Sequence, residues 1–143
     1  MARNFLNKSK LIKVKDHSAA STADVTSDII DTAGYEGVVF ITSFGTANAT
    51  NTIKVQQNTA NQTTGMADLT GTSVTSGSSD EDVIVEVYKP LERYVQVVAA
   101  RGSSSTLESI WAILYDGPGP ASVNSVSGTQ VAELHVSPEQ GTA

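Results

Sequence analysis

The sequence predicts an all-β protein: a single-domain β-sandwich or jelly-roll-like barrel of about seven to eight short antiparallel strands with an extended N-terminal arm. Apolar and polar residues alternate along several short runs, as they do in strands that bury one face. Clusters of Gly, Pro, Ser, Asn and Asp separate these runs, and no run has a helical period. A chain of 143 residues is long enough to bury about 70% of its unfolded surface without cross-links, and it has no cysteine.

The most apolar third of the chain, residues 82–115, predicts three consecutive strands that form a meander. Pro90 ends the first strand because it removes a backbone donor, and residues 101–105 form a turn before the third. Trp111 lies inside the continuous apolar run 110–115, so we expect it in the core. The residues that share one face of the first strand are Val83, Val85 and Val87, and those of the second are Tyr94, Val98 and Ala100.

The N-terminal part divides into a flexible basic arm, residues 1–9, and a strand, residues 10–15. Lysines on the outer face of that strand are typical of a sheet edge that is protected against further pairing. Residues 10–136 are predicted to form the β-sandwich domain, and residues 137–143 an extended tail.

The middle of the chain mixes loops with two well-patterned strands. Residues 17–33 are predicted as a loop, which contains either one short helical turn or a crossover between sheets. Residues 38–44 are apolar on both faces and predict a central strand. Residues 52–57 alternate, with Ile53 and Val55 inward.

Residues 58–81 are almost entirely polar, and Met66–Leu69 is their one apolar island, either a short strand or a plug under the loop. A connection of this length commonly makes contacts with a partner. Beyond the apolar third, residues 116–120 predict a rigid exit from the sheet, and Gln130–Val136 a last strand.

The net charge of −6 is unevenly distributed along the chain, because residues 1–15 carry +5 and the remainder carries −11. An acidic body argues against nucleic acid, whose phosphates require clustered Lys and Arg. The basic segment either docks on an acidic protein surface or is a solvated terminus. No apolar run approaches the about 20 residues of a membrane helix, and no signal peptide is evident, so we expect no membrane partner and synthesis in the cytoplasm.

Candidate catalytic chemistry is sparse, and we expect no enzyme. Serines lie near the two histidines, His17 and His135, but serine is so frequent in this chain that their proximity does not indicate a nucleophile–base pair. The acidic groups at 80–82 and at Asp24, Asp28 and Asp31 match no calcium loop, so solvated carboxylates are favoured over a structural ion and no cofactor is expected. The aromatic residues would stack on sugars if they were exposed, but we expect them in the core: Trp111, Tyr35, Tyr88, Tyr94 and Tyr115.

Three stretches together resemble small head proteins of tailed bacteriophages, the capsid decoration or cement proteins: DIIDTAGYEGVVFITSFGT (28–46), YKPLERYVQVVAARG (88–102) and AELHVSPEQGTA (132–143). The resemblance covers about a third of the chain. It implies a non-enzymatic structural virion protein on the capsid exterior that stabilises contacts between major capsid subunits. It also implies the partners: the major capsid protein, and further copies of the chain as dimers or trimers.

The hypothesis for the contact surface combines the basic arm with the long loop 58–82. The expected capsid-contact residues are Arg3, Lys8, Lys10, Lys13, Lys15, Met66 and Leu69. Two other function classes stay open: a carbohydrate-binding or host-surface adhesion module, which requires exposed aromatics in a groove, and a head–tail connector or tail component, which requires ring oligomers.

Overall fold

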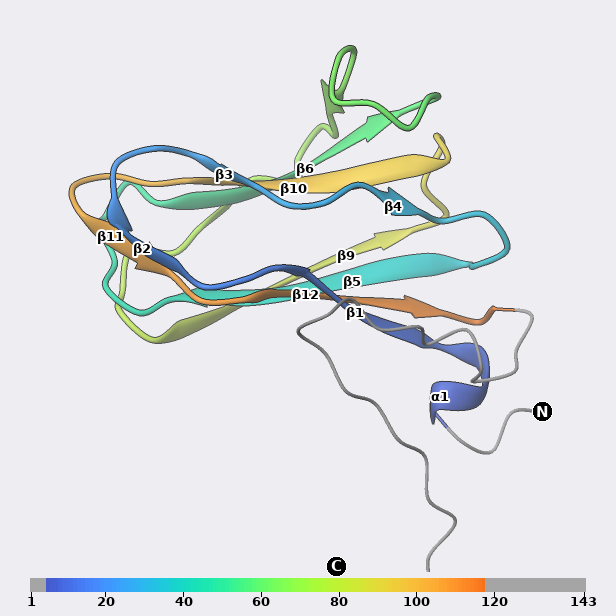
Figure 1. Cartoon of the computed structure of the whole chain (residues 1–143), viewed down its shortest axis with the longest axis horizontal. Helices are drawn as coiled ribbons and strands as arrows, with labels where there is room; N and C mark the ends of the chain where they lie inside the picture. The colour runs from blue at the N-terminus through green and yellow to red at the C-terminus, as the bar shows by residue number, and fades with distance from the viewer. Residues whose placement is uncertain (1–4, 118–143) are drawn as a thin grey trace, which may run out of the picture.

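The computed structural model describes residues 5–117, and these residues form a β-sandwich of two antiparallel sheets with a small third sheet at one end (Figure 1). The all-β prediction is therefore confirmed. The first sheet has the strand order β1-β12-β5-β9, with bounds β1 Lys10–Lys15, β12 Ile110–Tyr115, β5 Gly37–Phe44 and β9 Glu81–Tyr88. Its central strands, β5 and β12, have no charged residue.

The second sheet is built on the long pair β10 and β6, and four two-residue strands extend it on both sides. Its strands are β10 Tyr94–Ala100, β6 Thr52–Asn58, β3 Val25–Thr26, β4 Ile30–Asp31, β7 Ala67–Asp68 and β8 Val74–Thr75. β3 and β4 both pair with β10, whereas β7 and β8 both pair with β6. A two-stranded sheet of β2 (Ser18–Ser21) and β11 (Ser105–Leu107) completes the described fold.

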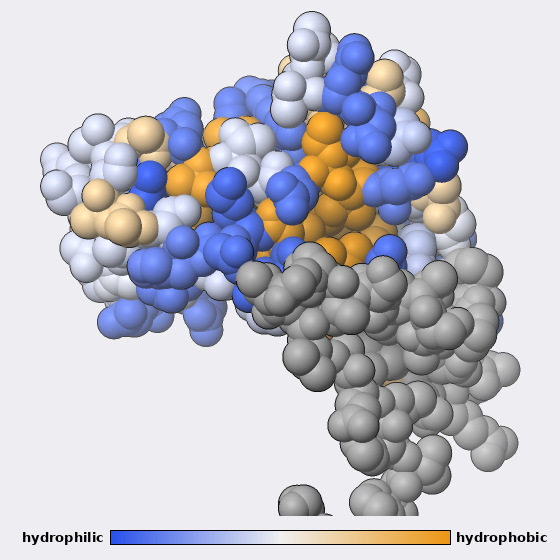
Figure 2. All heavy atoms as spheres, viewed as in Figure 1, coloured by the Kyte–Doolittle hydropathy of each residue, from blue (hydrophilic) through white to orange (hydrophobic). Residues whose placement is uncertain are grey.

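The core lies between the two large sheets, and period-two alternation puts it there. The inward residues of β5 and β9 include Val38, Phe40, Val83 and Val85, all less than 9% exposed. Opposite them lie the inward residues of the second sheet: Val95, Val97, Ala99, Ile53 and Val55. In the view of Figure 2, hydrophobic residues gather between the two layers, and hydrophilic residues predominate on the loop above them.

Several predicted strands are confirmed. β5 is a central strand, β1 lies at an edge of its sheet within residues 5–117, and β6 turns Ile53 and Val55 inward. The island 66–69 supplies β7, and Leu69 packs against the core, so both interpretations of the island hold.

The predicted meander is wrong. β9 pairs with β5 and β10 pairs with β6, so the strands of residues 82–115 alternate between the two sheets instead of lying side by side. A strand's alternation shows which residues it buries but not which strand it pairs with. The partner residues of β9 and β10 lie 36 to 51 positions earlier in the chain, as in Tyr94–Asn58 and Tyr88–Gly37.

The loop predicted for residues 17–33 contains β2, β3 and β4. These strands are two to four residues long and rich in Ser, Ala and Thr, so their pairing depends on β10 and β11 rather than on their own β-propensity. The described residues contain twelve strands, whereas seven or eight were expected for the chain. The additional strands are only two to four residues long, and strands this short leave no alternating pattern in the sequence. The predicted strand 130–136 and the tail lie outside the described residues.

The predicted N-terminal arm is in part a helical turn, α1 (Phe5–Lys8), whose Lys8 carbonyl accepts a hydrogen bond of 2.7 Å from the Gly117 N–H. The main chain at the end of the described segment is thereby tied to the start of β1.

Candidate interaction surface

The first sheet is apolar on its outer face as well as on its inner face. Cross-strand registers align the outward side chains in rows across the four strands. One row runs Lys13, Trp111, Ile41, Ile84, and the next runs Leu11, Ile113, Val39, Glu86. Ile84 is 64% exposed, and the other apolar members are half-buried. We call these two rows the outer face.

An antiparallel sheet that packs on one side only normally presents polar residues to water on the other. The second sheet follows that rule, since Lys54 and Gln56 of β6 point outward and hold Asp68 through hydrogen bonds of 2.8 Å each. The outer face of the first sheet departs from it over both central strands. Contiguous exposed apolar surface of this kind marks an interaction site.

Trp111 was expected in the core, and this prediction is wrong. β12 alternates buried and half-buried residues, so Ala112 and Leu114 point inward while Trp111 points outward. The Lys13 ammonium lies 5.7 Å from the Trp111 ring centroid and 3.0 Å from an Asp16 carboxylate oxygen. These contacts hold the indole at the surface by a cation–π interaction.

The tyrosines are not among the buried core residues either, although Tyr35 packs against the core. Tyr88 is 62% exposed, and Tyr35, Tyr94 and Tyr115 are half-buried. The Tyr115 hydroxyl donates to Glu86, and burial, followed by this carboxylate, raises the pKa of Tyr115 to about 12. Tyr115 also packs over Gly37 on the neighbouring strand, where a Cβ would collide with its ring.

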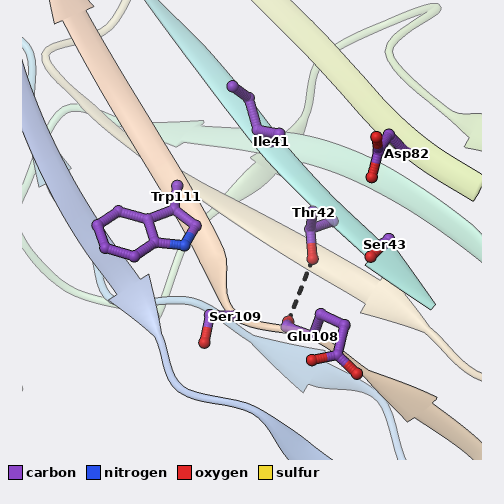
Figure 3. A pocket seen from close by; sticks show the side chains of 7 residues that line it. All are labelled: Ile41, Thr42, Ser43, Asp82, Glu108, Ser109 and Trp111. Atoms are coloured by element: carbon purple, nitrogen blue, oxygen red, sulfur yellow. Dashed lines mark hydrogen bonds between the residues drawn. The ribbon is translucent and has the colours of Figure 1, made fainter. Parts of the chain in front are cut away.

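A shallow hollow of about 340 Å³ opens beside Trp111 at one end of the outer face (Figure 3). The Thr42 hydroxyl donates to the Glu108 carbonyl across it at 3.2 Å, and the Glu108 carboxylate lies 3.4 Å from the His17 imidazole. The hollow thus combines an aromatic surface with carboxylates and hydroxyls. Its lining residues are Ile41, Thr42, Ser43, Asp82, Glu108, Ser109 and Trp111.

A second hollow of about 480 Å³ lies beside the β9–β10 connection. Pro90 and Leu91 line one side of it, and Leu91 is 88% exposed. Across from them lie Thr32 and Tyr35.

The structure places the predicted contact residues on two opposite edges of the sandwich. Lys8 is exposed in α1, and β1 contains Lys10, Lys13 and Lys15. The Val14 carbonyl of β1 accepts a hydrogen bond of 2.8 Å from the Asp28 N–H. Met66 and Leu69 lie in the loop that carries β7 and β8, beyond β6. Arg3 lies outside the described residues.

The loop 58–80 is hydrogen-bonded to strand β6 of the sandwich. The Leu69 N–H donates to the Val55 carbonyl at 2.9 Å, and the Thr72 hydroxyl accepts from the Val55 N–H at 3.1 Å. Asn58 donates to the carbonyls of Gln62 and Thr64. These bonds fix the direction in which the loop projects (Figure 1).

Sequence reasoning missed the outer face, although a signal for it was present. Residues 38–41 and 110–115 are apolar at nearly every position, which identifies strands with two apolar faces. The prediction that failed is the placement of Trp111 in the core, because within residues 5–117 a second sheet packs against one face of β5 and β12 and Trp111 lies on the other.

Among residues 5–117 no group of three or more His, Asp or Glu side chains is placed to hold a metal ion, and no helix is long and apolar enough to span a membrane. Comparison with known proteins adds no relative: no protein-family model matches the chain, and no curated protein matches it.

Proposed function

We propose that this chain is a structural virion protein of a tailed bacteriophage that binds the outside of the capsid and stabilises contacts between major capsid subunits. The observation that carries the proposal is the apolar outer face, which gives a small sandwich a surface suited to assembly. The resemblance of residues 28–46, 88–102 and 132–143 to phage decoration proteins supplies the partner and the location.

The arrangement of the two predicted contact segments supports a clamp. The lysines of α1 and β1 lie on one edge of the sandwich, and the loop with Met66 lies on the other. A body with contacts on opposite edges is suited to touch two neighbouring capsid subunits at once. Basic side chains on one edge would meet acidic capsid surface, and the half-buried Met66 would add apolar contact.

Such binding stabilises a shell by linkage. A ligand that binds only the assembled lattice shifts the equilibrium toward it by about 2.7 kcal/mol per site when its free concentration is 100-fold above Kd. Repetition over a symmetric lattice multiplies this effect even when each contact is modest.

The proposal is tested by co-sedimentation of the purified protein with phage heads that lack it, using full-length protein and two variants. Deletion of residues 1–9 removes the basic arm and is expected to reduce occupancy while the sandwich stays folded. Lys89→Ser, which removes an exposed lysine far from β1, is the matched control and should bind as the unmodified protein does. Unchanged occupancy after the deletion would contradict the role of the arm.

A second candidate function is sugar binding, and the hollow beside Trp111 favours it. A half-exposed indole next to the Asp82 and Glu108 carboxylates is a pattern that recognises hydroxyl-rich rings. Because Trp111 is the only tryptophan and lines this hollow, its fluorescence reports on a ligand that binds there. Saturable quenching by a host-surface glycan would favour adhesion over decoration.

A further inference from the structure

We infer that the outer face is the surface on which a second copy of the chain docks, forming a dimer with twofold symmetry. This inference rests on the proposal that the protein works in an assembly, and it names the occupant of the face. The observation behind it is that the face is complementary to itself in both polarity and charge.

The charge pattern comes from the two edge strands. On the outer face β1 presents Lys13, whereas its Lys10 pairs with the inward Leu114. β9 presents Asp82 and Glu86 there, whereas its Glu81 pairs with the inward Phe44. Between them β12 and β5 carry no charge. The first sheet therefore has a positive edge, an apolar centre and a negative edge.

Twofold symmetry would bring the positive edge of one copy over the negative edge of the other. When two sheets stack face to face about a twofold axis parallel to their strands, the strand order reverses, so β1 of each copy lies over β9 of the other. Lys13 shares a row with Ile84, so it would lie between the partner's Asp82 and Glu86, which are the outward neighbours of Ile84 on β9. The uncharged centres would meet each other.

This complementarity selects a second copy over other occupants. A nucleic acid or an anionic surface would require one sign of charge across the face. A sugar would occupy only the hollow beside Trp111 and would leave Val39, Ile113 and Ile84 exposed. A sheet face is also the surface that another sheet covers best, because aligned sheets interdigitate their side-chain rows.

The size of the face predicts a weak dimer. Four strands about 4.8 Å apart span about 19 Å, and six residues at about 3.4 Å each span about 20 Å. The footprint is therefore about 400 Å² per copy, or about 800 Å² in total, which is below the standard size of a stable specific interface and typical of a weak, transient one. We expect a dissociation constant in the micromolar range, and attachment to a lattice would strengthen the association by raising the local concentration of copies.

The first test measures association of the full chain, without capsids, by sedimentation velocity across micromolar concentrations. The expected result is a monomer–dimer equilibrium accompanied by a blue shift of Trp111 emission, because the only tryptophan lies in the face. Ile84→Glu should weaken the dimer about tenfold or more. Leu91→Glu is the matched control: Leu91 is even more exposed, lies off the face, and should leave the equilibrium unchanged.

The second test examines the order of the strands. Lys13→Glu and Asp82→Lys each place like charges together across the dimer and should each weaken it. Combining the two should restore association to within about threefold of the unmodified chain. Lys13 and Asp82 lie on opposite edges of one sheet, so rescue within a single copy is not expected.

Three results would overturn the inference. A chain that stays monomeric up to hundreds of micromolar has no such dimer. A dimer that Ile84→Glu leaves intact uses another surface. A monomer whose head binding is lost with Ile84→Glu uses the outer face for a capsid subunit. By contrast, a dimer that behaves as expected but fails to bind heads would contradict the proposed function and leave the inference standing.

Discussion

At the scale of single residues, Asn51 joins three loops at one end of the sandwich. It is fully buried, its Oδ1 accepts from the Gly102 N–H at 2.8 Å, and its Nδ2 donates to the Ser105 hydroxyl at 3.0 Å. Its backbone carbonyl accepts from the Ser76 N–H at 3.0 Å. Buried polar groups are tolerated in a core only when they are bonded in this way.

Asn51→Ala is expected to lower the free energy of unfolding by about 2–4 kcal/mol, because the Gly102 N–H and the Ser105 hydroxyl lose their buried partner. Urea denaturation followed by far-ultraviolet circular dichroism measures the change. Asn61→Ala, in an exposed loop, should stay within about 0.5 kcal/mol of the unmodified protein. Equal effects of the two variants would contradict the assigned role of Asn51.

Asp31 and Arg93 join β4 to β10 through two hydrogen bonds of 2.8 and 2.7 Å. The hydrogen bond from Arg93 is the main cause that lowers the pKa of Asp31 from its ordinary 3.8. A lowered carboxyl pKa contributes stability that is present above the unfolded value and is lost as the pH falls through the folded value.

The stability difference between the unmodified protein and Asp31→Asn should therefore be constant above about pH 5 and should shrink as the pH falls below 3.8. Urea titrations at a series of pH values give this difference directly. Because both side chains are about half exposed, the effect should be small and should diminish in high salt. A difference that grows on acidification would contradict the assignment.

At the scale of elements, the best predictions came from strands whose own residues determine their environment. Ile53 and Val55 alternate with Lys54 and Gln56, and this pattern alone places β6 with one face inward. In β3 and β4, by contrast, two residues pair with β10 from across the fold. Nothing in their Ser- and Thr-rich surroundings encodes such a partner.

The loop that carries β7 and β8 shows how an element without its own core gains order. Leu69 is half-buried and packs against the hydrophobic core, while Met66 is half-buried but does not belong to that cluster. The docking of Leu69 and the bonds of Thr72 to Val55 hold the loop against β6.

Leu69→Ala should accelerate amide hydrogen exchange in residues 62–75 and lower the free energy of unfolding by about 1–2 kcal/mol, less than for a fully buried leucine. Met66→Ala is the control and should change neither quantity as much. Hydrogen exchange with mass spectrometry makes the comparison. Unchanged protection of the loop in Leu69→Ala would show that Leu69 does not anchor it.

At the scale of the whole molecule, the sequence was enough to predict an all-β sandwich but not its pairing or its candidate surface. The continuous apolar runs of β5 and β12 were visible, and the run 110–115 led to the expectation that Trp111 lies in the core. The structure separates an inner face against the second sheet from an outer face that includes Trp111 and Ile84. Only the arrangement of strands reveals that the positive β1 and the negative β9 border this face on opposite sides.

We expect the protein to assemble on a capsid, and its co-sedimentation with phage heads that lack it, with protein-free and DNA controls, measures this binding directly. The expected result is saturable binding to heads, at a stoichiometry that matches a symmetry axis of the lattice, and no binding to DNA. Protein that stays in the supernatant at every concentration would contradict the claim.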